Sequence, residues 1–195
     1  MTALPTHLFH PPADGWTLAD LEQVPEGARV EILDGALIVN PSPLPLHQRM
    51  VRRLAAQLEP VLPPQWQLET DVDVMLGTDP LEYVTPDVVV FGADVPLTTR
   101  PIDASQVVIV VEVVSRGSRR EDRGSKPLAY ADAGVPWYWR VESSLSNAPA
   151  TPTTLHEHRL VTSALGRGYR EVARHTGRCT IGDPFPLALD LSRLA

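Results

Sequence analysis

Two short runs of β-branched residues, each adjoining one acidic residue, constrain the fold of this chain most strongly. Residues 88–91 follow Pro86-Asp87, and residues 107–111 precede Glu112. Runs of this length and composition, bounded by loop signals, predict buried strands that carry both acids. An ionised carboxylate there needs a compensating partner, and two converging carboxylates and a divalent cation satisfy one another. The pattern predicts a metal site at Asp87 and Glu112, with Mg²⁺ as the natural cation and Mn²⁺ as the alternative.

Length and composition indicate one globular domain. A chain of 195 residues with 43% apolar content can bury one sizeable core, so we expect a single domain over residues 1–195. The single cysteine, Cys179, excludes an internal disulfide and fits a reducing cytosol. No apolar run is long enough to span a bilayer, and no early segment has the form of an export signal. We therefore expect a soluble, cytoplasmic protein with no membrane partner.

The net charge of −7 argues against a protein that coats nucleic acid non-specifically, because that binding requires many basic residues. A local basic stretch leaves room for a DNA-binding face. It follows the Glu112 strand and contains Arg116, Arg119, Arg120, Arg123 and Lys126 against Glu121 and Asp122. An isolated stretch of this kind is usually a solvated loop. Its position beside the carboxylates favours a role in substrate binding, which we assign to Arg119 and Arg120.

The order of the elements predicts an α/β (α+β) domain with a mixed central sheet flanked by helices. An N-terminal helix capped by Thr17 precedes a β-hairpin that turns at Asp34-Gly35. The other expected elements are helices over 47–58 and 125–133, strands over 67–76, 88–91, 107–112 and 138–142, and a second hairpin over 153–161 and 169–175. In the first of these helices, one apolar face carries Met50, Val51, Leu54 and Leu58.

Lys126 is the candidate cation of the site. Asp122, Lys126 and Tyr130 are four residues apart, so on a helix they would share one face. Pro127 is comfortable only in a first turn, which places the helix start near Ser125 and Asp122 outside it. Hydrolysis of a phosphodiester needs an activated water and an offset for the growing negative charge. A lysine beside two carboxylates would orient the water or stabilise the pentacovalent phosphate, and the Val113 carbonyl is a reasonable third metal ligand.

Several motifs in order resemble the bacterial putative restriction endonuclease family, which belongs to the PD-(D/E)XK nuclease superfamily. The resemblance covers roughly residues 15 to 175. It implies a restriction-endonuclease-like fold, Asp87 and Glu112 as metal ligands, Lys126 as the catalytic lysine and Glu31 as an additional acid. The motifs are Glu31-Ile-Leu-Asp-Gly35, Pro41-Ser-Pro43 with His47, Pro86-Asp87-Val-Val-Val90, Val111-Glu-Val-Val-Ser115, then Asp122, Lys126, Tyr130 and Ala133-Gly-Val-Pro-Trp-Tyr-Trp139.

Three positions depart from the family or superfamily pattern. Val114 stands where the superfamily usually places its lysine, and Lys126 on the following helix matches the arrangement of this family. Ala36 and Trp137 stand where the family usually has glutamates. Because the two acids and the lysine are intact, these departures affect accessory roles more than the chemistry.

Four further residues have weaker assignments. His47, at the start of its helix, could approach a phosphate or merely cap. Tyr130 could contact phosphate or hydrogen-bond Glu31, although a tyrosine on a helix facing a sheet is more often a core residue. His156 and His158 alternate onto one side of a strand, a spacing compatible with zinc but with no identifiable third ligand.

The leading hypothesis is a magnesium-dependent endonuclease that cleaves DNA by direct water attack. The alternatives are a catalytically silent DNA- or protein-binding module that retains the nuclease fold, and a metal-dependent hydrolase of a smaller phosphoester. A homodimer is expected by analogy, because cutting both strands of a duplex suits two sites related by two-fold symmetry.

Overall fold

The computed structural model describes residues 12–13, 15–25, 28–114, 124–143, 152–164 and 166–195. Its α-helices are α1 (Leu18–Leu21), α2 (Pro45–Leu58) and α3 (Ser125–Asp132), and its 3₁₀ turns are Glu59–Val61, Ala104–Gln106 and Leu191–Arg193. The strands are β1 (Val30–Leu33), β2 (Ala36–Val39), β3 (Trp66–Thr70), β4 (Val74–Thr78), β5 (Leu81–Val84), β6 (Val88–Gly92), β7 (Ile102–Asp103), β8 (Val107–Val114), β9 (Trp137–Glu142), β10 (Thr154–Ser163), β11 (Gly166–Thr176), β12 (Arg178–Ile181) and β13 (Leu187–Asp190).

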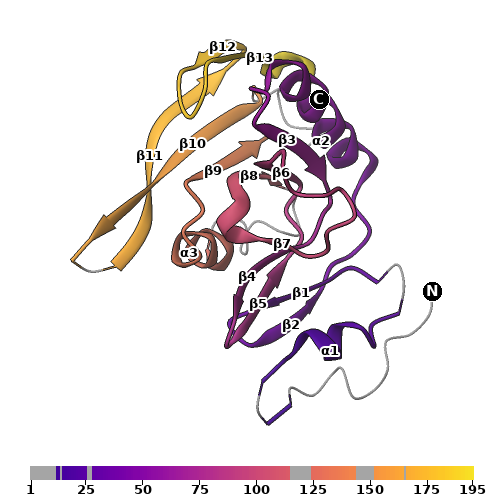
Figure 1. The fold of residues 1–195 in the computed structure, drawn as a ribbon. Coiled ribbons are helices and arrows are strands. Elements are labelled where there is room, and N and C mark those ends of the chain that lie inside the picture. Colours follow the sequence, from indigo (N-terminus) through magenta and orange to yellow (C-terminus); the bar gives the residue numbers. More distant parts are fainter. Residues whose placement is uncertain (1–11, 14, 26–27, 115–123, 144–151, 165) are drawn as a thin grey trace.

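The central sheet has six strands in the order β11-β10-β9-β8-β6-β3 (Figure 1). Strands β8 and β9 pair in parallel, and the other neighbours in this sheet pair antiparallel. The expected mixed sheet is thus confirmed. Helix α3 lies on the β8–β9 crossover, as a parallel connection requires. All residues of β6 and β8 are buried, which is why both read as continuous apolar runs.

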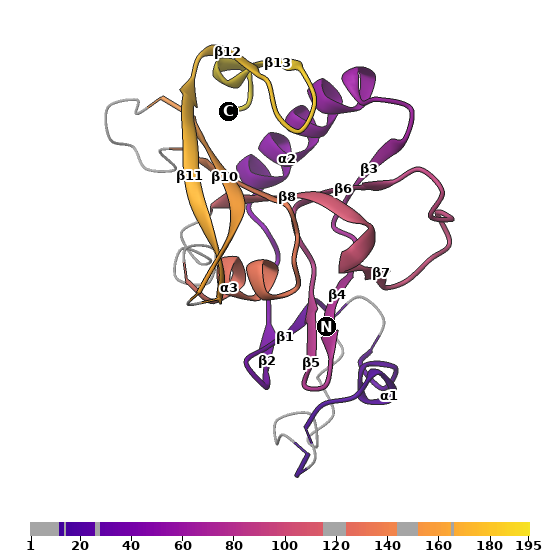
Figure 2. The same ribbon diagram turned by 60° about the vertical axis from the view of Figure 1, so that its left-hand side comes forward.

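Each face of the central sheet has its own apolar core. Alternate residues such as Val111 and Trp139 face α2, β12 and β13, where they pack with Leu54, Leu58 and Leu191. The intervening residues, for example Val110 and Tyr138, face α3 and the second sheet. Figure 2 shows α2 and the β12–β13 pair at one end of the molecule and the strands of the second sheet at the other. The apolar face predicted for α2 is confirmed, because Met50, Val51, Leu54 and Leu58 are its buried apolar residues.

The second sheet has five strands in the order β2-β1-β5-β4-β7. Its first hairpin, β1–β2, is the predicted one, and Asp34 and Gly35 occupy its turn with φ of 51° and 72°. Positive φ at both positions is what a two-residue Asp-Gly hairpin turn requires. The remaining sheet consists of β12 and β13 alone.

The single strand predicted over residues 67–76 is wrong. It is two strands, β3 in the central sheet and β4 in the second sheet. Asp71, with φ of 54°, lies between them and redirects the chain. Sequence alternation continues across the break, so the period alone could not reveal it.

Other boundaries follow the predictions closely. Helix α1 is confirmed in place but is only one turn long, with Thr17 and Asp20 forming a reciprocal capping box. Helix α3 begins at Ser125 as expected from Pro127. The second hairpin is confirmed and is longer than predicted, as β10 and β11 span ten and eleven residues. No helix of the described residues is long and apolar enough to cross a membrane.

Candidate active site

Lys126 joins two carboxylates that come from different sheets. Its Nζ lies 2.9 Å from Oε1 of Glu31 on β1 and 3.1 Å from Oε1 of Glu112 on β8. All three side chains are buried, with 2 to 6% of each residue exposed. Lys126 is also the only lysine of the chain, in which every other basic residue is arginine. A buried ammonium in this position is stable because two carboxylates compensate it.

Glu31 reaches the site because β1 pairs with β5, and β5 leads directly into the segment before β6. The same oxygen that contacts Lys126 accepts a 2.8 Å hydrogen bond from the backbone N–H of Thr85. Glu31 is therefore held by the backbone of Thr85, which follows β5, and by Lys126 of α3. Glu31 is thus a buried residue that faces the cluster.

Tyr130 is completely buried and donates a 2.6 Å hydrogen bond from its hydroxyl to Oε1 of Glu112. It lies one helical turn after Lys126, so α3 presents both groups to the same carboxylate. Burial, together with the charge of Glu112, raises the pKa of Tyr130 well above its ordinary value. The hydroxyl is thus a permanent donor, and its partner is Glu112, not Glu31.

Asp87 lies immediately before β6, at the point where β6 meets β8. Its Oδ2 accepts a 2.6 Å hydrogen bond from the backbone N–H of Val113, and its Oδ1 is 3.0 Å from Nε2 of His47. Because a carboxylate only accepts, Nε2 of His47 carries a proton in this contact. His47, in the first turn of α2, is buried and contacts Asp87.

The backbone of β8 completes this arrangement. In a strand the N–H and C=O of one residue point to the same side, which is why paired residues exchange two hydrogen bonds. Since the Val113 N–H points to Asp87, the Val113 carbonyl lies on the same edge of β8. Asp87, the Val113 backbone and the neighbouring Glu112 thus come together at one end of the β6–β8 pair.

Three of the residues singled out in the sequence cannot be placed relative to this cluster, and two others have ordinary positions in the fold. Arg119, Arg120 and Asp122 lie outside the described residues. Ala36 is exposed and pairs with Leu33 in the β1–β2 turn. Trp137 is buried in the α2-facing core, and the guanidinium of Arg159 lies 5.7 Å from its ring centre. At both departures from the family pattern, the structure places an ordinary fold residue.

Sequence reasoning missed Arg140, which is the register partner of Glu112 on β9. Its Nε donates a 2.7 Å ion-paired hydrogen bond to Oε1 of Glu142. No local signal could have identified it, because cross-strand neighbours depend on the register between β8 and β9.

The His156 and His158 pair lies on the same side of β10, as the alternation predicts. Nδ1 of His156 is 3.0 Å and Nε2 of His158 is 3.7 Å from the same oxygen of Glu171 on β11. Among the described residues, no group of three or more His, Cys, Asp or Glu side chains is arranged to hold a metal ion. His156, His158 and Glu171 thus form one polar group in which Glu171 contacts both histidines.

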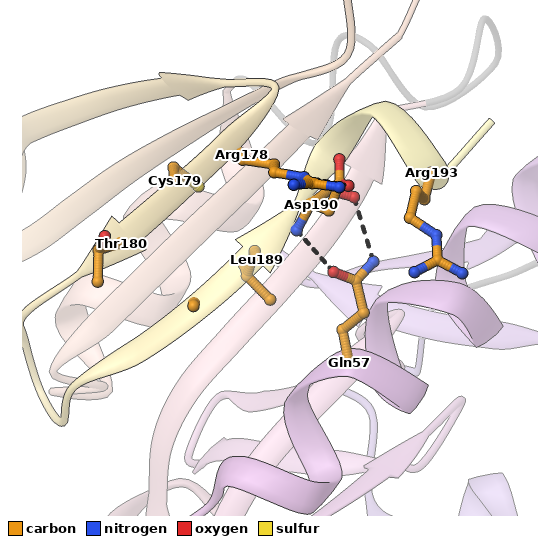
Figure 3. Close-up of a pocket in the computed structure, with 8 residues that line it drawn as sticks. Gln57, Arg178, Cys179, Thr180, Leu189, Asp190 and Arg193 are labelled. Carbon is orange, nitrogen blue, oxygen red and sulfur yellow. Dashed lines mark hydrogen bonds and ion pairs between the residues drawn. The ribbon is translucent and has the colours of Figure 1, made fainter.

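One surface pocket lies away from the carboxylates, between α2 and the β12–β13 pair (Figure 3). Gln57 crosses it and exchanges two hydrogen bonds with the backbone of Asp190, at 2.7 and 3.3 Å. Arg178 pairs with the Asp190 side chain at 3.1 Å. Gln57, Arg178 and Asp190 thus bind one another across the pocket. The pocket lies on the α2 side of the central sheet (Figure 3).

Comparisons with known proteins show the fold and the family of this chain. A crystal structure of a putative nuclease belonging to DUF820 from Anabaena variabilis ATCC 29413 has the same fold, with a TM-score of 0.62 at 15% identity. The alignment covers 92% of this chain and 97% of that one. No curated protein matches the sequence. The model of the Uma2 family, described as putative restriction endonuclease, matches residues 18–191. The chain, with its nuclease-like fold, therefore belongs to the Uma2 putative restriction endonuclease family.

Proposed function

We propose that this protein is a cytoplasmic metal-dependent endonuclease that hydrolyses DNA phosphodiester bonds. The observation that carries the proposal is the charge of the buried cluster. Glu31 and Glu112 are buried against the Lys126 ammonium, and Asp87 is buried at the same end of the β6–β8 pair, against His47 and the Val113 N–H. Buried charges are tolerated when they are compensated, and a divalent cation between Asp87 and Glu112 would compensate both carboxylates.

No three His, Cys, Asp or Glu side chains of the described residues form a metal-binding group, but two carboxylates with a backbone carbonyl and waters would suit Mg²⁺, or Mn²⁺ in its place. Asp87 and Glu112 offer carboxylate oxygens, and the Val113 carbonyl lies on the same strand edge as Asp87. Oxygen ligands of this kind, completed by waters, are what such hard cations prefer. When bound, the cation would activate the attacking water and offset the charge that develops on the phosphate.

The chain's own residues hold this arrangement in place. His47 and the Val113 N–H fix the Asp87 carboxylate through its two oxygens. Tyr130 and Lys126 fix Glu112, and Lys126 adds a positive charge next to the carboxylates. A preorganised ammonium group stabilises a transition state whose negative charge grows, without reorganising when the reaction occurs. We assign Lys126 the catalytic role and Glu31 the role of holding Lys126.

The first test is metal binding by calorimetry with Mg²⁺ and Mn²⁺. Wild type should bind, and Asp87→Asn/Glu112→Gln should not. Because Lys126 is the only lysine, protein labelled with ¹³C at the lysine ε-carbon gives one side-chain NMR signal, which should shift as metal is added. An unchanged signal and no heat, with and without uncleavable DNA, would contradict the metal site.

The second test is cleavage of plasmid DNA in Mg²⁺. Lys126→Met should reduce the rate by about 10²- to 10³-fold, the usual loss when one charge-stabilising group is removed. Arg178→Gln, which changes an exposed arginine of β12, is the control and should cleave like wild type. Equal cleavage by wild type and Lys126→Met would indicate a contaminating nuclease. DNA binding without cleavage would assign the chain to the non-catalytic alternative.

We also propose that the active form is a homodimer. Two sites related by two-fold symmetry suit the two antiparallel strands of a duplex. Light scattering during size-exclusion chromatography should give twice the chain mass of 21.4 kDa. A monomer that nicks only one strand per binding event would contradict this part of the proposal.

A further inference from the structure

A row of basic side chains continues the active-site face of the central sheet. Glu112 on β8 is the register partner of Arg140 on β9, Arg140 is the partner of His156 on β10, and His156 is the partner of Arg174 on β11. Residues directly opposite one another on neighbouring strands present their side chains to the same face. Neighbouring strands are about 4.8 Å apart, so the row extends about 14 Å from Glu112.

The row leads from the buried cluster to solvent. The side chains of Arg140 and His156 are 16% and 9% exposed, whereas that of Arg174 is 62% exposed. In Figures 1 and 2, β11 is the outer strand of this side of the sheet and, with β10, forms the long hairpin. A linear ligand whose end lay at Glu112 could therefore follow the row outward across the strands.

Each basic side chain of the row pairs with a partly exposed glutamate, either Glu142 or Glu171. Glu142 pairs with Arg140 at 2.7 Å, and the two oxygens of Glu171 pair with His156 at 3.0 Å and with Arg174 at 3.2 Å. Both glutamates are partly exposed. The Arg174–Glu171 pair is exposed, with side chains 62% and 37% exposed, and ion pairs so exposed contribute little to stability, so a competing anion can replace the carboxylate there. A phosphate is suited to this exchange because its oxygens accept paired hydrogen bonds from guanidinium groups.

The distribution of charge along the chain also favours an anionic ligand that runs from Glu112 towards β11. Residues 1–112 contain five basic and sixteen acidic residues, whereas residues 113–195 contain twelve basic and eight acidic residues. The first part builds the five-stranded sheet together with α2, β3, β6 and most of β8, whereas the second part builds α3 and β9 to β13. A polyanion is therefore attracted more to the second part, which contains β9, β10 and β11, than to the first.

We propose that Arg140, His156 and Arg174 form a track for the phosphate backbone of the DNA strand that leads away from the scissile bond, with Glu142 and Glu171 occupying the track until DNA displaces them. This inference rests on the proposed nuclease function and names the surface by which that site holds its substrate. Phosphate contacts of this kind position the strand and carry no sequence information.

The test measures binding of a fluorescent DNA duplex by anisotropy, in Ca²⁺ under conditions where a gel shows intact DNA. Arg174→Gln should weaken binding about tenfold and lower the slope of log affinity against log salt by about one. The matched control is Arg178→Gln, which removes a similar exposed arginine and a similar ion pair, 3.1 Å from Asp190, outside the row. It should bind as wild type does.

Glu171→Gln is expected to change DNA affinity in the opposite direction from Arg174→Gln. Removing this carboxylate leaves Arg174 and His156 available to phosphate, so binding should become several-fold tighter. A purely structural ion-pair group predicts no gain. The track is overturned if Arg174→Gln binds like Arg178→Gln, or if Glu171→Gln binds no tighter than wild type.

The two proposals fail in distinguishable ways. Metal-dependent cleavage by wild type that is unchanged in KM and rate in Arg174→Gln would reject the track and leave the nuclease function standing. Wild type that neither binds nor cleaves DNA would reject both.

Discussion

Glu112 accepts hydrogen bonds from two groups one helical turn apart, Lys126 and Tyr130, through a single oxygen. A charge-assisted hydrogen bond to a buried carboxylate is stronger than one to a neutral acceptor. The carboxylate is therefore oriented before any ligand arrives. This orientation, more than the identity of the acid alone, distinguishes Glu112 from an ordinary buried glutamate.

Removing the Tyr130 hydroxyl should affect both the orientation of Glu112 and the stability of the fold. Tyr130→Phe is expected to lower the cleavage rate by roughly tenfold and to cost about 1–3 kcal/mol of stability, because a buried carboxylate loses a donor. Cleavage assays and urea unfolding measure the two effects.

Tyr169→Phe is the matched control, since its hydroxyl donates at 2.7 Å to the backbone carbonyl of Val135. It should lose stability but keep its cleavage rate. Equal cleavage by both variants would show that Tyr130 only packs.

His47 should act through Asp87. Residues that hydrogen-bond a metal ligand typically change metal affinity by about 10- to 100-fold when removed. His47→Ala is therefore expected to weaken Mg²⁺ or Mn²⁺ binding by this amount in calorimetry. His47→Gln retains an N–H donor and should recover part of the affinity. If both variants bind metal as wild type does, His47 is not a positioning residue.

At the scale of elements, α3 and the hairpins determine which side chains meet. Helix α3 brings Lys126 and Tyr130 to Glu112, while the β1–β2 hairpin brings Glu31 from the other sheet. The β10–β11 hairpin adds a separate polar group, in which His158 contacts Glu171 and lies near Arg140. We therefore expect the stability of the hairpin to depend on pH.

Burial and the nearby Arg140 lower the pKa of His158 from its ordinary value of 6.5, and Glu171 opposes them. The folded state thus favours neutral His158, and its contribution to stability is present above about pH 6.5. That contribution is lost as pH falls, because the unfolded chain binds the proton more readily. His158→Gln should therefore show a smaller fall in melting temperature between pH 7.5 and 5.5 than wild type. An equal fall would contradict this assignment.

At the scale of the whole molecule, the C-terminal residues belong to the main core. Leu191 and Leu194 are completely buried with Leu54 and Leu58 of α2 and with the central sheet. The resemblance seen in the sequence ended near residue 175, whereas the family match extends to residue 191. The β12–β13 pair and the turn after it are thus part of the fold that supports the site.

Leu191→Ala should therefore destabilise the whole protein by about 2–5 kcal/mol, the usual cost of a cavity left by a buried leucine. Leu128→Ala, on the exposed side of α3, is the matched control and should change stability by less than about 0.5 kcal/mol. Leu128 is 63% exposed. Similar unfolding midpoints in urea for the two variants would show that the C-terminal segment folds independently of the core.

Elements whose burial or turn chemistry is local can be predicted from the sequence. The apolar runs at Val88 and Val107, the Asp34-Gly35 turn and the apolar face of α2 each carry their signal within a few residues. The sequence also indicated Asp87, Glu112 and Lys126 as candidates, because charged residues beside buried elements need partners.

The partners of these charged residues become visible only once the chain is folded. That Glu31 shares Lys126 with Glu112, that His47 contacts Asp87, and that Arg140 stands beside Glu112 all depend on strand register and on how two sheets meet. The split of residues 67–76 between those sheets was equally hidden. Local patterns specify which face of an element is buried, but contacts between distant segments arise only when their faces pack together.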